Sequence, residues 1–308
     1  MTPLTTPDSE GIPALADEEP ADEHETRAYL IERSNRPFAP ILKAFVQNPD
    51  RKLKDRSAPL ALFVRNGDLR GLRALLFLHA IISSGNGDNG WSTTLPLATW
   101  ARAFDTTTGA DRRSASTAAT KVLTRLTNRK LIRRARAGRA RQVTVTLLRP
   151  DGSGAEYTRP DGTSDRFLKL DNRFWTERWY QRLDLPATAM LLVALHEKPI
   201  FELPTEHMPE WYGFSADTAE RGLKRLRDLD LITVHTRTKK APLAPTGATQ
   251  VNVYTLAPPF APGRASTTRG RAAAKSVAPK SGSTTPGRET SGRQTIRKRP
   301  PRREGKQS

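Results

Sequence analysis

Apolar residues recur at helical spacing in two segments of the chain that lie 100 positions apart. In the first segment, apolar side chains at positions 119, 122, 123 and 126 follow the i, i+3, i+4, i+7 pattern of one helix face. In the second, positions 219, 223, 226 and 229 form a similar stripe, preceded by Ser215 or by a capping box of Asp217 and Glu220. We therefore predict two amphipathic helices, the first over about residues 114–129.

Each predicted helix is followed by two short stretches with the alternating pattern of β-strands. These stretches are residues 131–135 and 142–148 in the first segment, and residues 231–236 and 250–256 in the second. A basic turn at 136–139 joins the first pair, and a longer loop at 239–247 joins the second. Each helix is therefore expected to lead into a two-stranded hairpin.

The two segments also match residue by residue, which indicates an internal repeat. KVLTRL in the first helix aligns with RGLKRL in the second at the offset of 100, and so does the Leu-Ile pair that follows each helix. QVTV then aligns with QVNV, after eight additional residues in the second copy. Since a helix ending and a strand recur in the same order, the match extends beyond what any two amphipathic helices share.

Two further helices are predicted upstream of each copy. They are residues 72–83 and about 97–104 in the first copy, and residues 186–197 and 206–212 in the second. Between the copies, RPDGSGAEYTRPDGTSD contains two R-P-D-G turns, with a hairpin expected between them. We therefore expect a first domain at 36–150, a linker at 151–165 and a second domain at 166–260.

Three helices followed by a two-stranded hairpin is the element order of the winged helix-turn-helix superfamily, and the chain resembles it twice. The resemblance is carried by SASTAATKVLTRLTNRKLIRRARAGRARQVTVTLL and by SADTAERGLKRLRDLDLITVHTRTKKAPLAPTGATQVNVYTL, and with the leading helices it spans about residues 72–148 and 186–256. It implies a mostly α fold with small β-hairpin wings, of the α+β class, arranged as two tandem winged-helix domains. It also implies that the third helix of each domain enters the major groove of DNA, while the wing touches the backbone or the minor groove.

The charge of the chain points to the same kind of partner. Among 308 residues, 51 Lys and Arg stand against 32 Asp and Glu, and the net charge of +19 favours a polyanion, most often nucleic acid. Residues 1–35 carry −7, residues 261–308 carry +11 and the middle carries +15. Both ends have few large apolar side chains, so we expect an acidic, mostly disordered head and a disordered basic tail. A helix is expected late in the head, at HETRAYLIERS, with Tyr29 and Leu30 docking on the folded part.

The expected DNA contacts are polar and basic residues off the apolar stripes, together with the bases of the hairpins. In the first copy they are Ser116, Thr117, Thr120, Lys121, Thr124, Arg125, Arg133, Arg134, Arg136, Arg139 and Arg141. In the second copy they are Thr218, Arg221, Lys224, Arg225, Lys239 and Lys240. Residues 112–141 carry 11 bases and no acid, whereas residues 215–240 carry seven bases and four acids. We therefore expect the first copy to bind DNA more strongly, and the second to face DNA, solvent or another protein.

Other function classes find little support in the sequence. The chain has no cysteine, which excludes a disulfide framework and cysteine-ligated metals, and no run of 18 apolar residues. It has no phosphate-binding P-loop and no HExxH, GxSxG or GxGxxG motif, so we expect no catalytic residue, no cofactor and no metal. His79 and His196 lie in apolar helices and are expected to be hydrogen-bonded core residues. We expect Trp175, Trp179 and Tyr180 to serve interdomain or dimer packing rather than base stacking.

Together these features predict a non-enzymatic protein that binds double-stranded DNA. Arrangement, length and charge are similar to plasmid replication initiators of the tandem winged-helix kind, so replication initiation of a plasmid or mobile element is the first expectation. A transcriptional regulator is one alternative, and a scaffold whose winged helices bind other proteins is another. The expected partners are DNA, a second copy of the chain, or the replication or transcription machinery, with no membrane. The expected location is the cytoplasm, in association with the nucleoid.

Overall fold

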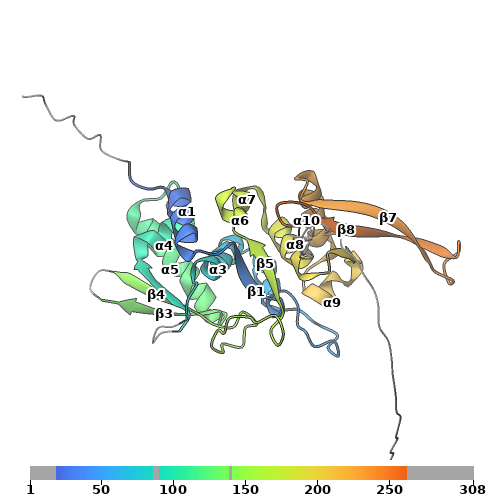
Figure 1. Ribbon diagram of the computed structural model, residues 1–308, viewed down its shortest axis with the longest axis horizontal. Helices are drawn as coiled ribbons and strands as arrows, with labels where there is room; N and C mark the ends of the chain where they lie inside the picture. Colours follow the sequence, from blue (N-terminus) through green and yellow to red (C-terminus); the bar gives the residue numbers. More distant parts are fainter. Residues whose placement is uncertain (1–18, 86–89, 139–140, 262–308) are drawn as a thin grey trace, which may run out of the picture. The chain divides into compact units, whose positions relative to one another are not determined.

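The computed structural model describes residues 19–85, 90–138 and 141–261 (Figure 1). Helices and small antiparallel sheets alternate along these residues, which is the mixed class expected from the sequence. No helix in these three stretches is long and apolar enough to cross a membrane. The predictions of disorder in residues 1–18 and 262–308, and of a DNA contact by Arg139, concern parts of the chain outside the described residues.

The first half of the described chain runs helix, strand, two helices and a hairpin. Its elements are α3 (Leu69–Ile81), β2 (Ser92–Pro96), α4 (Leu97–Ala103), α5 (Arg112–Asn128), β3 (Ile132–Ala137) and β4 (Gln142–Leu147). β4 lies at the centre of a three-stranded antiparallel sheet, between β2 and β3. The sequence predicts all of these elements except β2, whose Ser-Thr-Thr-Leu-Pro sequence shows no alternating pattern.

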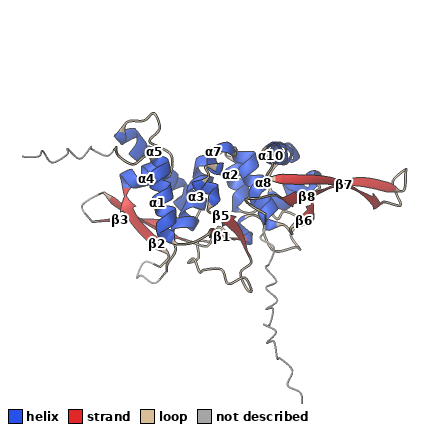
Figure 2. Ribbon diagram, turned by 45° about the horizontal axis from the view of Figure 1, so that its top comes forward, coloured by secondary structure: helices blue, strands red, loops and turns tan. Residues whose placement is uncertain are grey.

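The second half follows the same path. Its elements are α8 (Leu185–His196), β6 (Ile200–Glu202), η2 (Thr205–His207), α9 (Met208–Tyr212), α10 (Ala216–Asp228), β7 (Ile232–Lys240) and β8 (Ala248–Leu256). β8 lies between β6 and β7, so the first strand pairs with the last strand in both halves. β7 and β8 have nine residues each, against six in β3 and β4, and their hairpin extends well beyond the neighbouring helices (Figures 1 and 2). The strand predicted to end at residue 236 thus continues to Lys240, and the loop is shorter than expected.

Further elements precede the first half and lie between the two. They are α1 (Glu23–Ser34), β1 (Phe38–Leu42), η1 (Lys43–Phe45), α2 (Pro59–Arg65), β5 (Phe167–Asp171), α6 (Arg173–Thr176) and α7 (Trp179–Arg182). β1 pairs antiparallel with β5, from Phe38 opposite Asp171 to Leu42 opposite Phe167. This two-stranded sheet brings together the segments that flank the first half, a pairing that the sequence does not predict.

Helix α1 is the helix predicted late in the acidic head. It begins with a capping box, in which Asp22 and Glu25 each accept the other's backbone N–H at 2.7 and 2.9 Å. Leu30 is buried as expected, whereas Tyr29 is 65% exposed, so its expected docking is wrong. Arg27 is buried, donates to the Tyr180 hydroxyl at 2.6 Å and lies 4.5 Å from the centre of that ring. A buried arginine thus anchors α1 to α7.

The aromatic residues before the second half form part of the core. Trp175 and Tyr180 are buried, with ring centres 5.4 Å apart. Trp175 also packs edge-on against Phe77 of α3 at 5.1 Å. Trp179 is only partly buried and lies 6.1 Å from Phe260. Trp175 thus packs between the two predicted domains, as expected, whereas the contact of Trp179 with Phe260 lies within the second.

His79 is buried in α3 without the expected hydrogen bonds. Neither of its ring nitrogens has a hydrogen-bond partner among the described residues, so the prediction of a hydrogen-bonded core histidine is wrong for this position. The ring instead packs edge-on against Tyr157 of the linker at 5.4 Å. Burial lowers the pKa of His79 to about 4, with a smaller contribution from the nearby Arg36, so the imidazole is neutral at physiological pH.

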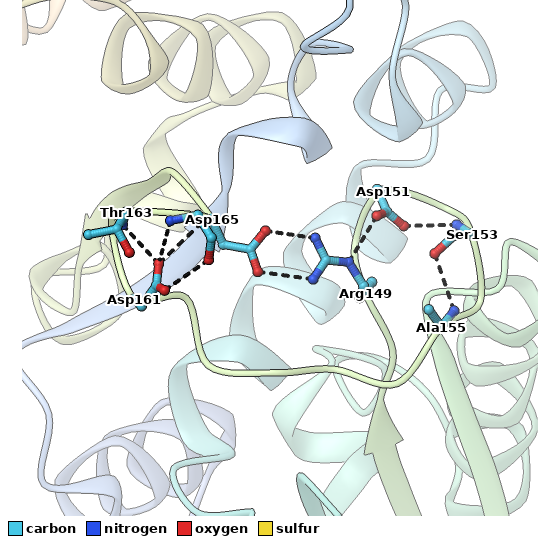
Figure 3. Close-up of polar contacts among 8 residues, drawn as sticks. Arg149, Asp151, Ser153, Ala155, Asp161, Thr163 and Asp165 are labelled. Atoms are coloured by element: carbon cyan, nitrogen blue, oxygen red, sulfur yellow. Dashed lines mark hydrogen bonds and ion pairs between the residues drawn. The ribbon is translucent and has the colours of Figure 1, made fainter. Parts of the chain in front are cut away.

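One arginine holds the two ends of the linker together (Figure 3). Arg149 donates from Nε to Asp151 at 3.1 Å and from both Nη atoms to Asp165 at 3.0 and 2.8 Å. Asp161 accepts three backbone N–H groups at 2.8, 3.0 and 3.2 Å and closes the second R-P-D-G segment. The predicted hairpin between these segments is wrong, because one isolated bridge takes its place in residues 148–156.

The contact between α8 and α10 depends on Gly222. A Cβ at this position would collide with the carbonyl oxygen of Pro186 and would lie 2.5 Å from Cγ of Met190. Both approaches are closer than a non-bonded contact allows, so the missing side chain lets the two helices approach closely.

We expect Gly222→Val to lower the free energy of unfolding by about 1–3 kcal/mol, because overpacking forces the helices apart. Arg227→Val places the same residue on the exposed side of α10 and should cost less than about 0.7 kcal/mol. Urea unfolding followed by circular dichroism measures both values. Equal losses in the two variants would show that valine itself, and not the close contact, causes the effect.

The linker ion pair makes stability depend on pH. The hydrogen bond from Arg149 holds the pKa of Asp165 below its usual value. The pair therefore stabilises the fold fully above pH ~4, and this contribution is lost as the pH falls through the lowered pKa. We expect Asp165→Asn to cost about 1 kcal/mol at pH 7, and the difference from the unaltered chain to disappear in stronger acid. Unfolding curves across this pH range test it.

The control for this prediction is Glu32→Gln, which removes one exposed carboxylate from α1. Its effect should stay within about 0.5 kcal/mol at every pH. A loss of stability for Asp165→Asn that is the same at pH 7 and in strong acid would contradict an electrostatic origin.

Candidate nucleic-acid interface

Helix α5, the third helix of the first half, presents a basic face to solvent. Asp111 caps its N-terminus by accepting two backbone N–H groups at 2.8 and 3.0 Å, so the helix begins at Arg112, two residues before the predicted start. Its apolar stripe is buried as predicted. Arg113, Thr117 and Lys121 lie at four-residue spacing on the opposite, exposed face.

Most cations of α5 and its hairpin have no local counter-charge. Seven are exposed and, among the described residues, have no carboxylate within 4.0 Å: Arg112, Arg113, Lys121, Lys130, Arg134, Arg136 and Arg141. The paired cations are Arg125, Arg129 and Arg133. An unpaired exposed charge can bind a phosphate without first giving up an ion pair. We therefore call these seven residues the open cations of the first half.

Arg125 has a partner inside the protein. It donates to both carboxylate oxygens of Asp68, at 3.1 and 2.9 Å, and Arg129 lies 2.8 Å from the same carboxylate. Asp68 also caps α3 by accepting the N–H of Gly71 at 3.0 Å. Burial raises the pKa of Asp68, but these hydrogen bonds and the arginine charges outweigh it and hold the pKa below its usual value. Arg125, predicted to contact DNA, therefore links α5 to α3.

The hydroxyl residues predicted to contact DNA are bonded to their own helix. Ser116, Thr117, Thr120 and Thr124 each donate to the carbonyl four residues earlier, at 2.8–2.9 Å. A hydroxyl has a single proton to donate, and phosphate oxygens only accept. In this conformation these side chains offer a ligand their acceptor lone pairs, which suits a base amino group rather than a phosphate.

The arginines of the first hairpin lie on both of its faces rather than in one group. Arg134 and Arg136 share the face that packs toward α5, and Arg134 donates to the carbonyl of Thr120 at 3.2 Å. Arg133 lies on the opposite face, 3.5 Å from Glu156 of the linker. Arg134 therefore continues the basic face of α5 onto the hairpin, whereas Arg133 points elsewhere.

Helix α10, the third helix of the second half, has its cations engaged. Ser215 is its N-cap and accepts the N–H of Thr218 at 3.2 Å, which decides between the two caps that the sequence allows. Arg221 pairs with Asp217, and Lys224 pairs with Asp228. The two residues of each pair are one helical turn apart, and their charged groups lie 3.0 and 2.8 Å from each other. Both pairs are exposed, so each contributes little to stability but lowers the net charge of this face.

The remaining cations predicted in the second half divide into two groups. Arg225 donates to the carbonyl of Arg182 at 3.1 Å, and Lys239 lies 3.2 Å from Glu202. Lys240, near the end of the hairpin, has no carboxylate within 4.0 Å among the described residues. Carboxylates therefore neutralise Arg221, Lys224 and Lys239, while α5 keeps most of its cations open. The sequence could not show this difference fully, because Asp68 and Glu202 lie far along the chain from the cations they hold.

Comparisons of the chain with protein-family models, with curated proteins and with solved structures find no match.

Proposed function

We propose that this chain is a non-enzymatic protein that binds double-stranded DNA through two tandem winged-helix units. Both halves follow the path helix, strand, two helices and hairpin, with the first strand paired to the last. In winged-helix proteins this path presents the third helix to the major groove and the hairpin to the backbone. The observation that carries the proposal is the set of open cations on α5 and its hairpin.

The open cations favour a polyanion for a physical reason. Exposed like charges near one another repel, and salt screens this repulsion only partly. A phosphate backbone supplies the missing counter-charges and releases its own condensed cations when it binds. Lys121 is central in this arrangement, since it is exposed and the hydroxyl groups around it are already donating to the helix.

The ion pairs of the second half are compatible with either DNA binding or protein binding by this half. Exposed pairs such as Arg221–Asp217 are each worth about 0–1 kcal/mol, so a phosphate can displace the carboxylate at low cost. The same pairs also suit a protein surface of mixed charge, and this observation keeps the protein-interaction scaffold as the second candidate function for this half.

For the process served, we propose replication initiation of a plasmid or mobile element, with transcriptional regulation as the alternative. Support comes from the tandem order, the length and the basic charge, which are similar to those of tandem winged-helix initiators. Mapping of the DNA bound in the source cell separates the two processes. Clustered repeats beside a replication gene favour initiation, and promoters favour regulation.

We expect Arg113→Glu with Lys121→Glu to weaken binding to random duplex DNA at least tenfold at ~0.1 M salt. The slope of log affinity against log salt should fall by about two units, because two cations no longer neutralise phosphates. Fluorescence anisotropy of a labelled 20-base-pair duplex measures both quantities. Arg125 is left unaltered, since its replacement would deprive the Asp68 carboxylate of both a counter-charge and two hydrogen bonds.

The matched control is Arg221→Glu with Lys224→Glu in α10, which changes the net charge by the same amount. It should weaken binding less, because carboxylates already offset these cations. Equal losses would overturn the ranking of the two halves. Binding by the unaltered chain that does not respond to salt would overturn the DNA-binding proposal itself.

A further inference from the structure

An open cleft of about 1190 Å³ lies between the segment that precedes the first half, the linker and the second half. One wall comes from the segment around η1 and α2, a second from the linker, and a third from the end of α8 and from α9. The cleft is distinct from the exposed face of α5. Of the residues in and next to this helix, only Arg129 lines the cleft.

The lining is strongly basic. Its cations are Lys43, Arg51, Arg56, Arg65, Arg129, Arg149, Arg166 and Lys198, against the carboxylates of Asp151, Asp165 and Glu197. Two of the three carboxylates pair with an arginine of the lining, whereas Glu197 is hydrogen-bonded but keeps its negative charge, which acts on Lys43. Arg149 holds Asp151 and Asp165, and Glu197 accepts from the Tyr212 hydroxyl at 2.5 Å and lies 3.3 Å from Nδ1 of His196. The cleft therefore has an excess of positive charge that its own acids do not neutralise.

Three of these cations are fixed in the wall by neutral groups. Lys43 donates to the carbonyl of His196, and Arg65 donates to the carbonyl of Gly213 at 2.5 Å. Arg56 donates to the side-chain oxygen of Gln47 at 2.6 Å. A carbonyl positions a cation without cancelling its charge, so these contacts hold positive charge in place. The side chain of Lys43 is partly buried, and this burial lowers the pKa of its ammonium group.

Three other cations stand exposed at the cleft. Arg51, Arg166 and Lys198 come from three separate segments and, within the described part of the chain, have no hydrogen-bond acceptor or carboxylate in reach of their charged groups. Their arrangement around an open cleft, rather than at one point, suits a ligand that carries several separated negative charges.

The C-terminal end of α5 reaches the cleft. Arg129 follows the last residue of α5 and lines the cleft, while its guanidinium lies 4.2 Å from the ring centre of Phe63 in α2. Lys130, one of the open cations, follows it directly along the chain. Arg129 is paired with Asp68, so of these two residues only Lys130 adds a positive charge without a carboxylate partner among the residues described.

We infer that this cleft is a second nucleic-acid contact, which holds the sugar–phosphate backbone of the DNA beyond the segment that α5 contacts. The inference rests on the proposed function, and it adds a separate surface to it. The expected contacts are Arg51, Arg166 and Lys198 with phosphate oxygens, with Lys43 and Arg65 supplying fixed charge behind them. Such contacts add affinity without sequence preference, because they involve no base edge.

The test replaces the three exposed cations together, as Arg51→Ala, Arg166→Ala and Lys198→Ala in the full chain. Because this variant neutralises three fewer phosphates, the slope of log affinity against log salt for a long duplex should fall by about three units. A control with Arg33→Ala, Arg70→Ala and Arg159→Ala removes the same charge from exposed positions outside this cleft and should leave the slope nearly unchanged. Melting temperatures of both variants that equal that of the unaltered chain show that neither has lost its fold.

The source of the phosphates is tested with tripolyphosphate as a competitor. The inference is supported if tripolyphosphate competes only weakly with DNA and if the affinity for DNA rises with duplex length in the unaltered chain but not in the cleft variant. Tight binding of tripolyphosphate that the cleft variant loses, with an unchanged duplex slope, overturns the inference in favour of a small polyphosphate ligand. If the cleft variant keeps the salt slope of the unaltered chain, and the chain does not bind tripolyphosphate, the cleft is not a binding site. The proposed function still holds in that case if DNA binding depends on Arg113 and Lys121. A complete absence of DNA binding in the unaltered chain overturns both.

Discussion

The direction of the basic face of α5 depends on one buried carboxylate, that of Asp68. It caps α3 and receives Arg125 and Arg129 from the end of α5, while Phe63 covers the second guanidinium. A buried charge that loses such partners costs about 3–5 kcal/mol, so the first and third helices of this half hold together as one unit. The open cations on the other side of α5 consequently have a fixed orientation relative to the rest of the half.

A second set of contacts joins the segment that precedes the first half to the second half, through backbone carbonyls. Arg65 donates to Gly213 at 2.5 Å, and Gln47 donates to Trp211 at 3.1 Å. Gly213 has a φ of 77°, and a Cβ there would lie 2.5 Å from that of Ser57, so the C-terminus of α9 approaches the start of α2 as only glycine permits. Direct contacts, and not the linker alone, therefore connect the segment of Gln47 and Arg65 to the end of α9.

The sequence predicts the features that repeat locally and misses those that join distant segments. The apolar stripe of α5 and the alternation of β4 are visible within one window, and both are confirmed. The β1–β5 pair is not visible, because two five-residue strands with more than a hundred residues between them carry no signal of their partnership. The candidate site shows the same limit. The helix pattern alone predicts that Lys121 is exposed. The ion pair between Arg125 and Asp68, in contrast, joins residues 57 positions apart in the sequence. The position of Asp68 at the start of a predicted helix could have indicated that it is an N-cap. It could not have indicated that the same carboxylate pairs with Arg125 and Arg129.

The placement of acids, more than the number of bases, separates the two halves. In the second half, Asp217 and Asp228 lie one turn from the cations they hold, so the helix neutralises itself wherever it folds. In the first half, the acids that meet α5 and its hairpin come from outside the helix, and they reach only Arg125, Arg129 and Arg133 among the described residues. The repulsion that remains among the open cations opposes folding of this hairpin, and a bound polyanion removes it. Since a ligand that binds only the folded state stabilises that state, a polyanion that bound this half would also favour its folding, and this effect should weaken as salt screens both.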